Sequence, residues 1–384
     1  MDMENAFSEY MSKAPNTKKI HYWDLHPQLC VGFSSNPVQK INMKGDSITV
    51  QRLCRLAGND PKMERNISFF LMHKSSGRKL RITLPLNLND ISFVNLYALM
   101  VSEGSHKTEF RLHVPEKIFH DMFIENLEAI FSNEIKKHVT QKMDKGVMRS
   151  NAPRAIRYFL PIPKHIPKLI LENKEYCRRY LQIAFEAEGS PIFVGNKRYI
   201  SLKRNVDVTP ILENKTKYPE YERIYFGQLK RDYNELAMNV EENPPITLLG
   251  EHLMLRYYFS IYSIMKPEAI RINETSHRCG KISARWALCI YADSVNKFIQ
   301  EIGFLSKRKQ TIANRMAKIV GRRRRHFALD IMRNIQKNGF FTGYDFSNEM
   351  KSYGYVSPRA YIYRYVKSGL IKRIGRSRYR LLVN

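Results

Sequence analysis

Cysteine is scarce in this sequence, and neither long apolar runs nor glycine-rich phosphate loops occur in it. The five cysteines are widely spaced and form no C-x-x-C pair, which argues against a disulfide framework and against a cysteine-rich zinc module. No run of about 18 apolar residues is present, and the first residues lack the pattern of a secretory signal. Without a P-loop or Rossmann motif, no nucleotide cofactor is expected. These absences predict a soluble, cytoplasmic protein with no membrane partner.

Acidic residues are also in short supply. The chain has 64 Lys and Arg against 36 Asp and Glu, a net charge of +28, which predicts a polyanionic partner and favours nucleic acid over a membrane surface. The excess is concentrated in residues 305–384, where 20 Lys and Arg face 3 acids, a net of +17. With 384 residues, 43% of them hydrophobic, the chain is long enough for two or three folded domains.

The basic C-terminal segment has the element order of a winged helix. Apolar residues recur every four positions from Phe327, which predicts an amphipathic helix. A second helix is expected from Thr342 to about Tyr353, and a third over 359–367, after a Ser-Pro start signal. Two short strands, about 370–374 and 378–383, then form a hairpin. We therefore predict a winged-helix domain over 322–384.

This domain offers a set of candidate DNA contacts. The third helix places cationic and aromatic side chains on one side, while Ile362 and Val366 face the core, and the hairpin supplies a wing of arginines. The candidates are Arg322, Arg323, Arg324, Arg325, Arg359, Tyr363, Lys367, Arg373, Arg376, Arg378 and Arg380. A winged helix used for protein contact is the alternative, and the charge argues against it.

The middle of the chain contains an internal repeat. Residues 96–105 read LYALMVSEGS and residues 181–190 read LQIAFEAEGS, so that Glu103 and Glu188 stand 85 positions apart at the ends of two apolar helices. Asn89 or Asp90 can cap the first helix and Asn173 the second, and the glycine after each glutamate ends the helix. Strand-like sequence follows each motif. Hairpins are also expected at 67–72 with 79–84 and at 269–274 with 282–291.

These motifs resemble those of the LAGLIDADG homing-endonuclease family. In LYALMVSEG and LQIAFEAEG the last acid and the glycine stand where that family has its final Asp and Gly, and WALCIYADSVNKFIQEIGF is similar to the family's closing pattern. The resemblance covers about residues 60–318. It implies an α+β fold in which two pseudo-symmetric αββαββα halves form a DNA-binding saddle, ahead of the winged helix. The expected divisions are 1–66, an N-terminal extension or part of the first half; 67–172, the first half; 173–318, the second half; and 322–384.

The resemblance also implies a site. The two motif helices would pack side by side, with Glu103 and Glu188 close together near a pseudo-two-fold axis, where the acids hold Mg²⁺ beneath the scissile phosphates. Two carboxylates brought together favour a hard divalent cation that activates water. Ile183 stands where close helix packing wants a small residue, and Val101 stands where the family often has an acid. Lys281 is the one candidate for a basic catalytic residue.

Two functional hypotheses follow. The first is a double-stranded DNA-binding protein without a cofactor, a replication initiator or transcription regulator derived from a homing endonuclease. The domain order resembles a bacterial regulator family with a non-cutting LAGLIDADG scaffold, and a basic C-terminal winged helix also resembles archaeal replication initiators. The second is an active endonuclease that makes Mg²⁺-dependent double-strand cuts. In either case we expect a nucleoid-associated monomer.

Overall fold

The computed structural model has a mixed helix and sheet fold that divides into two compact units. Unit 1 comprises Met1–Glu188 and Leu249–Met254, and unit 2 comprises Gly189–Leu248 and Leu255–Asn384. The structure describes residues 3–16, 18–25, 30–33, 47–71, 79–80, 82, 84–106, 109–194, 197–209, 223–273, 281–291, 294–318, 324–336, 339–353, 355 and 357–382. None of the helices within these ranges has the length and apolar character needed to cross a bilayer.

The N-terminal part of unit 1 has its own antiparallel sheet, in the strand order β3-β2-β4-β5. The elements are α1 (Met3–Ser12), β1 (Lys19–Ile20), β2 (Cys30–Phe33), β3 (Ser47–Thr49), α2 (Val50–Ala57), β4 (Ile67–Leu71), β5 (Lys79–Leu80) and β6 (Leu86–Asn87), with β1 paired to β6. The predicted hairpin of 67–72 with 79–84 is confirmed in β4 and β5. Because β4 also pairs with β2, residues on both sides of position 67 belong to one sheet, as they would if residues 1–66 were part of the first half.

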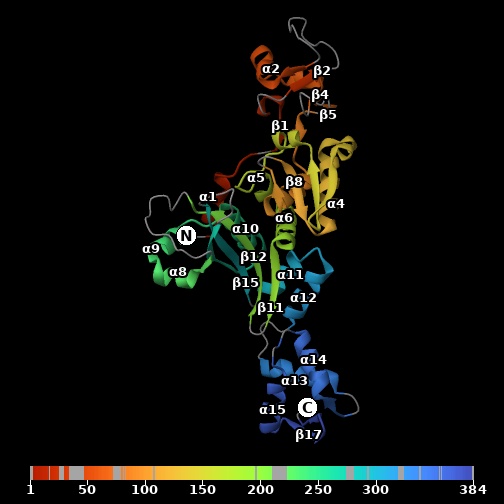
Figure 1. The fold of residues 1–384 in the computed structure, drawn as a ribbon, viewed down its shortest axis with the longest axis vertical. Helices are drawn as coiled ribbons and strands as arrows, with labels where there is room; N and C mark the ends of the chain where they lie inside the picture. Colours follow the sequence, from red (N-terminus) through yellow and green to blue (C-terminus); the bar gives the residue numbers. More distant parts are fainter. Residues whose placement is uncertain are drawn as a thin grey trace. The chain divides into compact units, whose positions relative to one another are not determined.

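The first repeat follows as a helix and a four-stranded sheet (Figure 1). Its elements are α3 (Ile91–Ser102), β7 (Gly104–Ser105), β8 (Phe110–Val114), α4 (Lys117–Phe131), β9 (Thr140–Asp144) and β10 (Val147–Ala152), and the strand order is β7-β8-β10-β9. Alternate residues of β8 are buried because α4 packs against β8 and β10. Phe110 of β8 and Phe123 of α4 lie with ring centroids 6.0 Å apart in this core. One face of the sheet is therefore covered by a helix.

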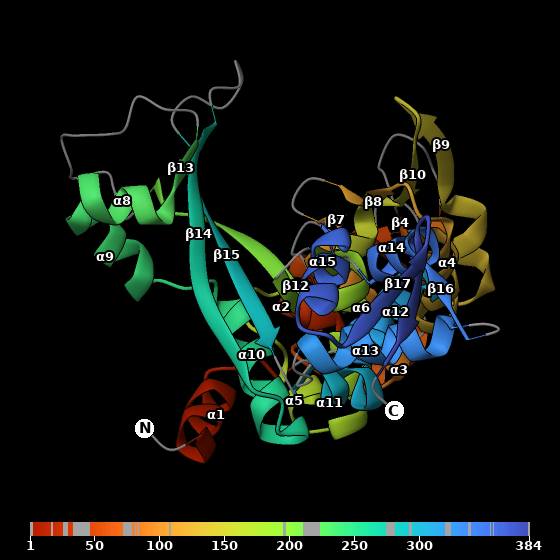
Figure 2. The same cartoon turned by 90° about the horizontal axis from the view of Figure 1, so that it is seen from below.

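The second repeat has the same strand order with an insertion. Its elements are α5 (Lys168–Leu171), α6 (Lys174–Ala187), β11 (Gly189–Val194), β12 (Lys197–Asp207), β13 (Arg223–Tyr225), α8 (Phe226–Asp232), α9 (Asn234–Glu242), α10 (Ile246–Phe259), β14 (Ser263–Asn273), β15 (Lys281–Tyr291), α11 (Ser294–Glu301) and α12 (Lys307–Ala317). The sheet order is β11-β12-β15-β14-β13. Without β13, the order β11-β12-β15-β14 matches the order β7-β8-β10-β9 of the first sheet. In both, the first and second strands along the chain are followed by the fourth and then the third. Figure 2 shows the long β14–β15 hairpin, which confirms the predicted pairing, with α8 and α9 beside it.

The C-terminal segment forms three helices and a three-stranded sheet. The elements are α13 (Arg324–Ile335), β16 (Phe341–Thr342), α14 (Gly343–Ser352), α15 (Arg359–Lys367), β17 (Ile371–Gly375) and β18 (Arg378–Leu381), with the strand order β16-β18-β17. The three predicted helices and the hairpin are confirmed, and β16 is additional. Thr342 caps α14, its hydroxyl accepting from the backbone of Asp345 at 3.1 Å. On α15, Ile362 is buried as predicted, but Val366 is 39% exposed, and the larger Tyr365 is buried beside Ile362 instead.

Candidate nucleic-acid interface

The two motif helices, α3 and α6, pack against each other, as predicted. Asp90 caps α3 and Asn173 caps α6, each accepting backbone N–H bonds of the following turn. The Tyr97 and Tyr180 rings lie 5.8 Å apart across the contact. The pair is therefore held by large side chains, and this explains how Ile183, which is fully buried, replaces the small residue expected for close packing.

A chain of hydrogen bonds joins the same helices to α4. Arg179 Nε donates to Asn95 Oδ1 at 2.7 Å, and Asn95 Nδ2 donates to Asn126 Oδ1 at 3.0 Å. Asn95 and Asn126 are both buried, so these bonds satisfy groups that would otherwise be costly to bury. Burial lowers the pKa of the Arg179 guanidinium. The network fixes the register of three helices.

Both motif glutamates occupy the C-cap position of their helix. The Glu103 N–H donates to Leu99 O at 2.8 Å, and the Glu188 N–H donates to Ala184 O at 3.0 Å. The contacts between α3 and α6 join Asn95 to Arg179 and Tyr97 to Tyr180, pairs that are 84 and 83 positions apart, close to the 85 between the glutamates. A nearly constant difference in residue number between contacting partners indicates that the two helices run in the same direction. Glu103 and Glu188 then lie at the same end of the pair.

The glycine after each glutamate begins a strand. Each helix ends at the predicted place, but neither Gly104 nor Gly189 has the positive φ that a left-handed helix cap uses. Glycine is required at position 104 for a steric reason, because an added Cβ would lie 2.6 Å from the Cα of Met100. The chain thus folds back closely over the last turn of α3 into β7.

The face of the first sheet opposite α4 carries cationic side chains that the sequence analysis did not identify. Arg111 and His113 of β8 point to this face, and the register places Arg149 of β10 opposite His113. Glu109 Oε2 accepts from Arg111 Nη1 at 2.8 Å and from Arg149 Nη2 at 3.0 Å. Arg149 Nε also donates to Asn151 Oδ1 at 2.9 Å. Glu109 therefore orients two partly buried guanidinium groups on this face, and Asp144 Oδ2 also lies 3.9 Å from Arg149 Nη1.

The second sheet has a similar polar face. Lys203 Nζ of β12 lies 2.8 Å from Glu268 Oε2 of β14, and Arg285 Nε of β15 donates to Asn205 Oδ1 at 3.4 Å. Lys266 Nζ donates to the hydroxyl of Tyr291 at 3.3 Å. The alternate residues, such as Leu202, Trp286 and Leu288, are buried. Period-two alternation in β12 and β15 was the signal that could have identified this face.

The predicted contacts of the C-terminal segment are on its surface. Arg359, Tyr363 and Lys367 of α15 are exposed, Tyr363 to 72%. The hairpin residues Arg373, Arg376, Arg378 and Arg380 are exposed as well. Three of these arginines are oriented locally: Arg373 Nε donates to Gly375 O at 3.3 Å, Arg380 Nε donates to Gly339 O at 3.2 Å, and the Arg378 guanidinium lies over the Phe340 ring at 5.1 Å.

Five other candidates are less well defined. Arg322 and Arg323 lie outside the described residues, and Arg324 and Arg325 are in the first turn of α13, with no side-chain description. Lys281 is the first residue of β15, and its side chain is likewise outside the described set. Within the described part of the chain, no three His, Cys, Asp or Glu side chains are grouped to bind a metal ion.

Comparison with known proteins finds a partial structural likeness. No protein-family profile matches the chain, and no curated protein matches it. Similar solved structures include I-DmoI in complex with DNA and Mn, at 11% identity and a TM-score of 0.31, covering 56% of this chain and 98% of that one. The N-terminal LAGLIDADG domain of DUF199/WhiA is 12% identical, with a TM-score of 0.32, and the match covers 61% of this chain and 90% of that domain. A variant of I-DmoI with its target DNA and Mg is 14% identical, with a TM-score of 0.29 and coverage of 56% and 98%. Likeness at this level does not show a family.

Proposed function

We propose that this chain is a sequence-specific double-stranded DNA-binding protein, built from a LAGLIDADG-like scaffold and a C-terminal winged helix. The observation that carries the proposal is the repetition of one sheet order, first-second-fourth-third, in two sheets that each present an open face with arginine or lysine. Each of these faces, taken by itself, is a surface suited to a segment of a duplex.

The chemistry of these faces fits DNA. Lysine and arginine neutralise phosphates, and arginine also reads guanine through two parallel hydrogen bonds in the major groove. On the first sheet, Glu109 holds Arg111 and Arg149 in place, which reduces the side-chain entropy lost on binding. Asn205, beside Arg285 on the second sheet, is a residue type that pairs with adenine. Both faces therefore combine phosphate contacts with groups that can distinguish bases.

The C-terminal segment supplies the second DNA-binding part of the proposal. Three helices followed by a hairpin support a winged helix in which α15 would be the recognition helix and β17–β18 the wing. The exposed Arg359, Tyr363 and Lys367 would contact the major groove, and the hairpin arginines would contact phosphates. Scaffold and winged helix together would recognise a long site, which suits a replication initiator or a transcription regulator associated with the nucleoid.

The motif glutamates favour a second candidate, a Mg²⁺-dependent endonuclease. Glu103 and Glu188 are equivalent C-cap residues at the same end of a helix pair, and two carboxylates with phosphate oxygens and water are a donor set that Mg²⁺ accepts. These two residues would hold the ion, which would supply a Lewis acid and an activated water at the phosphate. We favour the binding protein because the C-terminal segment adds a second set of exposed cationic side chains to the scaffold.

The decisive experiment is selection of binding sites from random duplexes with the full chain. The selected duplex is then tested with an Arg149→Ala and Arg285→Ala double variant, for which we expect at least a tenfold loss of affinity. Arg231→Ala is the matched control, because Arg231 is an exposed arginine on α8 of the insertion and does not belong to a strand of either sheet. Failure to enrich any site, or equal affinity of the double variant and the control, would contradict the proposal.

A further inference from the structure

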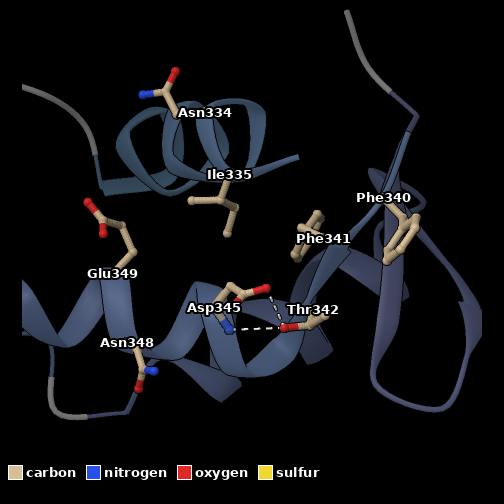
Figure 3. A pocket seen from close by; sticks show the side chains of 8 residues that line it. All are labelled: Asn334, Ile335, Phe340, Phe341, Thr342, Asp345, Asn348 and Glu349. Atoms are coloured by element: carbon tan, nitrogen blue, oxygen red, sulfur yellow. Dashed lines mark hydrogen bonds between the residues drawn. The ribbon is translucent and has the colours of Figure 1, made fainter. Parts of the chain in front are cut away.

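The C-terminal domain contains a pocket that none of its predicted DNA contacts lines. It lies between α13, β16 and α14, and its volume is about 440 Å³ (Figure 3). Ile335, Phe340 and Phe341 give it apolar walls. Ile335 of α13 and Glu349 of α14 point into the space between the two helices. The cavity is thus large enough for one long side chain and has an apolar surface against which that side chain can pack.

The charge of this pocket is opposite to that of its surroundings. Residues 305–384 contain only three acids among 20 Lys and Arg, and two of the three, Asp345 and Glu349, line the pocket. The third, Asp330, is paired with Arg333 at 3.1 Å. None of the described residues that line the pocket is cationic. A polyanion such as DNA is therefore repelled from a pocket that attracts cations.

The two carboxylates are arranged on one face of α14. They are four positions apart, so they lie one turn from each other. Thr342 Oγ1 donates to Asp345 Oδ2 at 2.7 Å and accepts from the Asp345 N–H, which holds that carboxylate beside Thr342 in the wall of the pocket (Figure 3). Burial, followed by the charge of the nearby Glu349, raises the pKa of the Tyr353 phenol, so Tyr353 stays protonated beside that carboxylate. A cation placed between the two acids would relieve their mutual repulsion.

We propose that this pocket receives an arginine side chain from a peptide segment of a partner protein. The aliphatic part of arginine would pack on Ile335 and Phe341, and the guanidinium would reach Asp345 and Glu349 with charge-assisted hydrogen bonds. Arginine fits better than lysine because its planar, weakly hydrated group also stacks on aromatic rings. The pocket residues and the predicted DNA contacts are separate sets, so the chain could bind a partner and a duplex together.

The test is isothermal titration of the full chain with the peptide Ac-Gly-Leu-Arg-Leu-Gly-NH₂. Its control is the same peptide with citrulline, which has nearly the shape of arginine without the charge. We expect the arginine peptide alone to bind, and Glu349→Gln or Asp345→Asn to weaken it at least fivefold. Asp330→Asn, which removes the third acid of the segment, is the matched control and is expected to bind like the wild type.

Three results would overturn the proposal: no binding of the arginine peptide, equal binding of the citrulline peptide, or an equal effect of Asp330→Asn. Self-association of the wild type that Glu349→Gln abolishes, without peptide binding, would identify a second copy as the occupant and also overturn it. Binding of the selected duplex is measured on the same variants and is expected to be unchanged, so that a failure here is distinguishable from a failure of DNA binding.

Discussion

At the scale of single residues, Glu103 and Glu188 have the same local environment. Each is the C-cap of an apolar helix, and each is followed at once by a glycine that starts a strand. A carboxylate at a helix C-terminus is electrostatically unfavourable, because the helix dipole is negative there. An unfavourable residue is therefore repeated at two equivalent positions, which is consistent with the metal-binding role considered for the second candidate function.

Replacing each glutamate by glutamine separates the two candidate functions. For Glu103→Gln and Glu188→Gln we expect folding to be retained and affinity for the selected duplex to rise by 0 to about 1 kcal/mol, because a negative charge near phosphate is removed. We also expect no cutting by the wild type when the duplex is incubated with Mg²⁺ and analysed on a denaturing gel. Double-strand cleavage that both variants lose would establish the endonuclease instead.

Helix α15 and the β17–β18 hairpin, the proposed recognition helix and wing, are expected to respond differently to alanine substitution. Arg359→Ala and Tyr363→Ala should change the preferred bases, with losses of about 1–3 kcal/mol confined to some positions of the site. Arg376→Ala in the wing should weaken all sequences alike and reduce the slope of log affinity against log salt by about one. Repeated site selection with each variant measures both effects. A uniform loss for Tyr363→Ala would contradict a recognition role for α15.

At the scale of elements, the link between α3 and β7 depends on Gly104. An alanine there must displace backbone, since its Cβ would lie 2.6 Å from Met100 Cα, so Gly104→Ala should lower the free energy of unfolding by about 1–3 kcal/mol. Gly227 of α8 is the control: its Cβ position has no heavy atom within 4 Å and its φ is not positive. Gly227→Ala should therefore stabilise by about 0.4–1 kcal/mol. Urea unfolding compares the two, and equal effects would contradict the steric explanation.

How far the elements could be predicted from sequence depended on how local their signals are. The motif helices, with Asp90 and Asn173 as caps, and the hairpin of β14 with β15 were predictable, because period and turn residues are local. Of the N-terminal sheet, only the β4–β5 hairpin was predictable, because β2 pairs with β4 across the whole of α2, and no local pattern records such a partner. Arg111 and Arg149 were missed for a similar reason, since an open sheet face exists only once strands pair.

At the scale of the whole molecule, charge should dominate binding. A net charge of +28, with +17 in the last 80 residues, implies many phosphate contacts and the release of many counterions. Raising salt from about 50 to about 200 mM should therefore lower affinity for a duplex more than tenfold, measured by fluorescence anisotropy. The arginine peptide proposed for the pocket is also cationic, and the salt dependence of its affinity is compared with that of the duplex. A change of less than tenfold for the duplex would contradict the polyanion interpretation.

The insertion in the second repeat has a consequence for how a duplex would be bound. Strand β13 and helices α8 and α9 lie in the chain between β12 and β14, and they have no counterpart in the first repeat. The C-terminal domain follows the second repeat only. Two identical subunits bind a palindromic site equally well in either orientation. Two unlike repeats in one chain distinguish the two orientations of a site. A site recognised by this protein would be non-palindromic, and the bound protein would give the DNA an upstream and a downstream side.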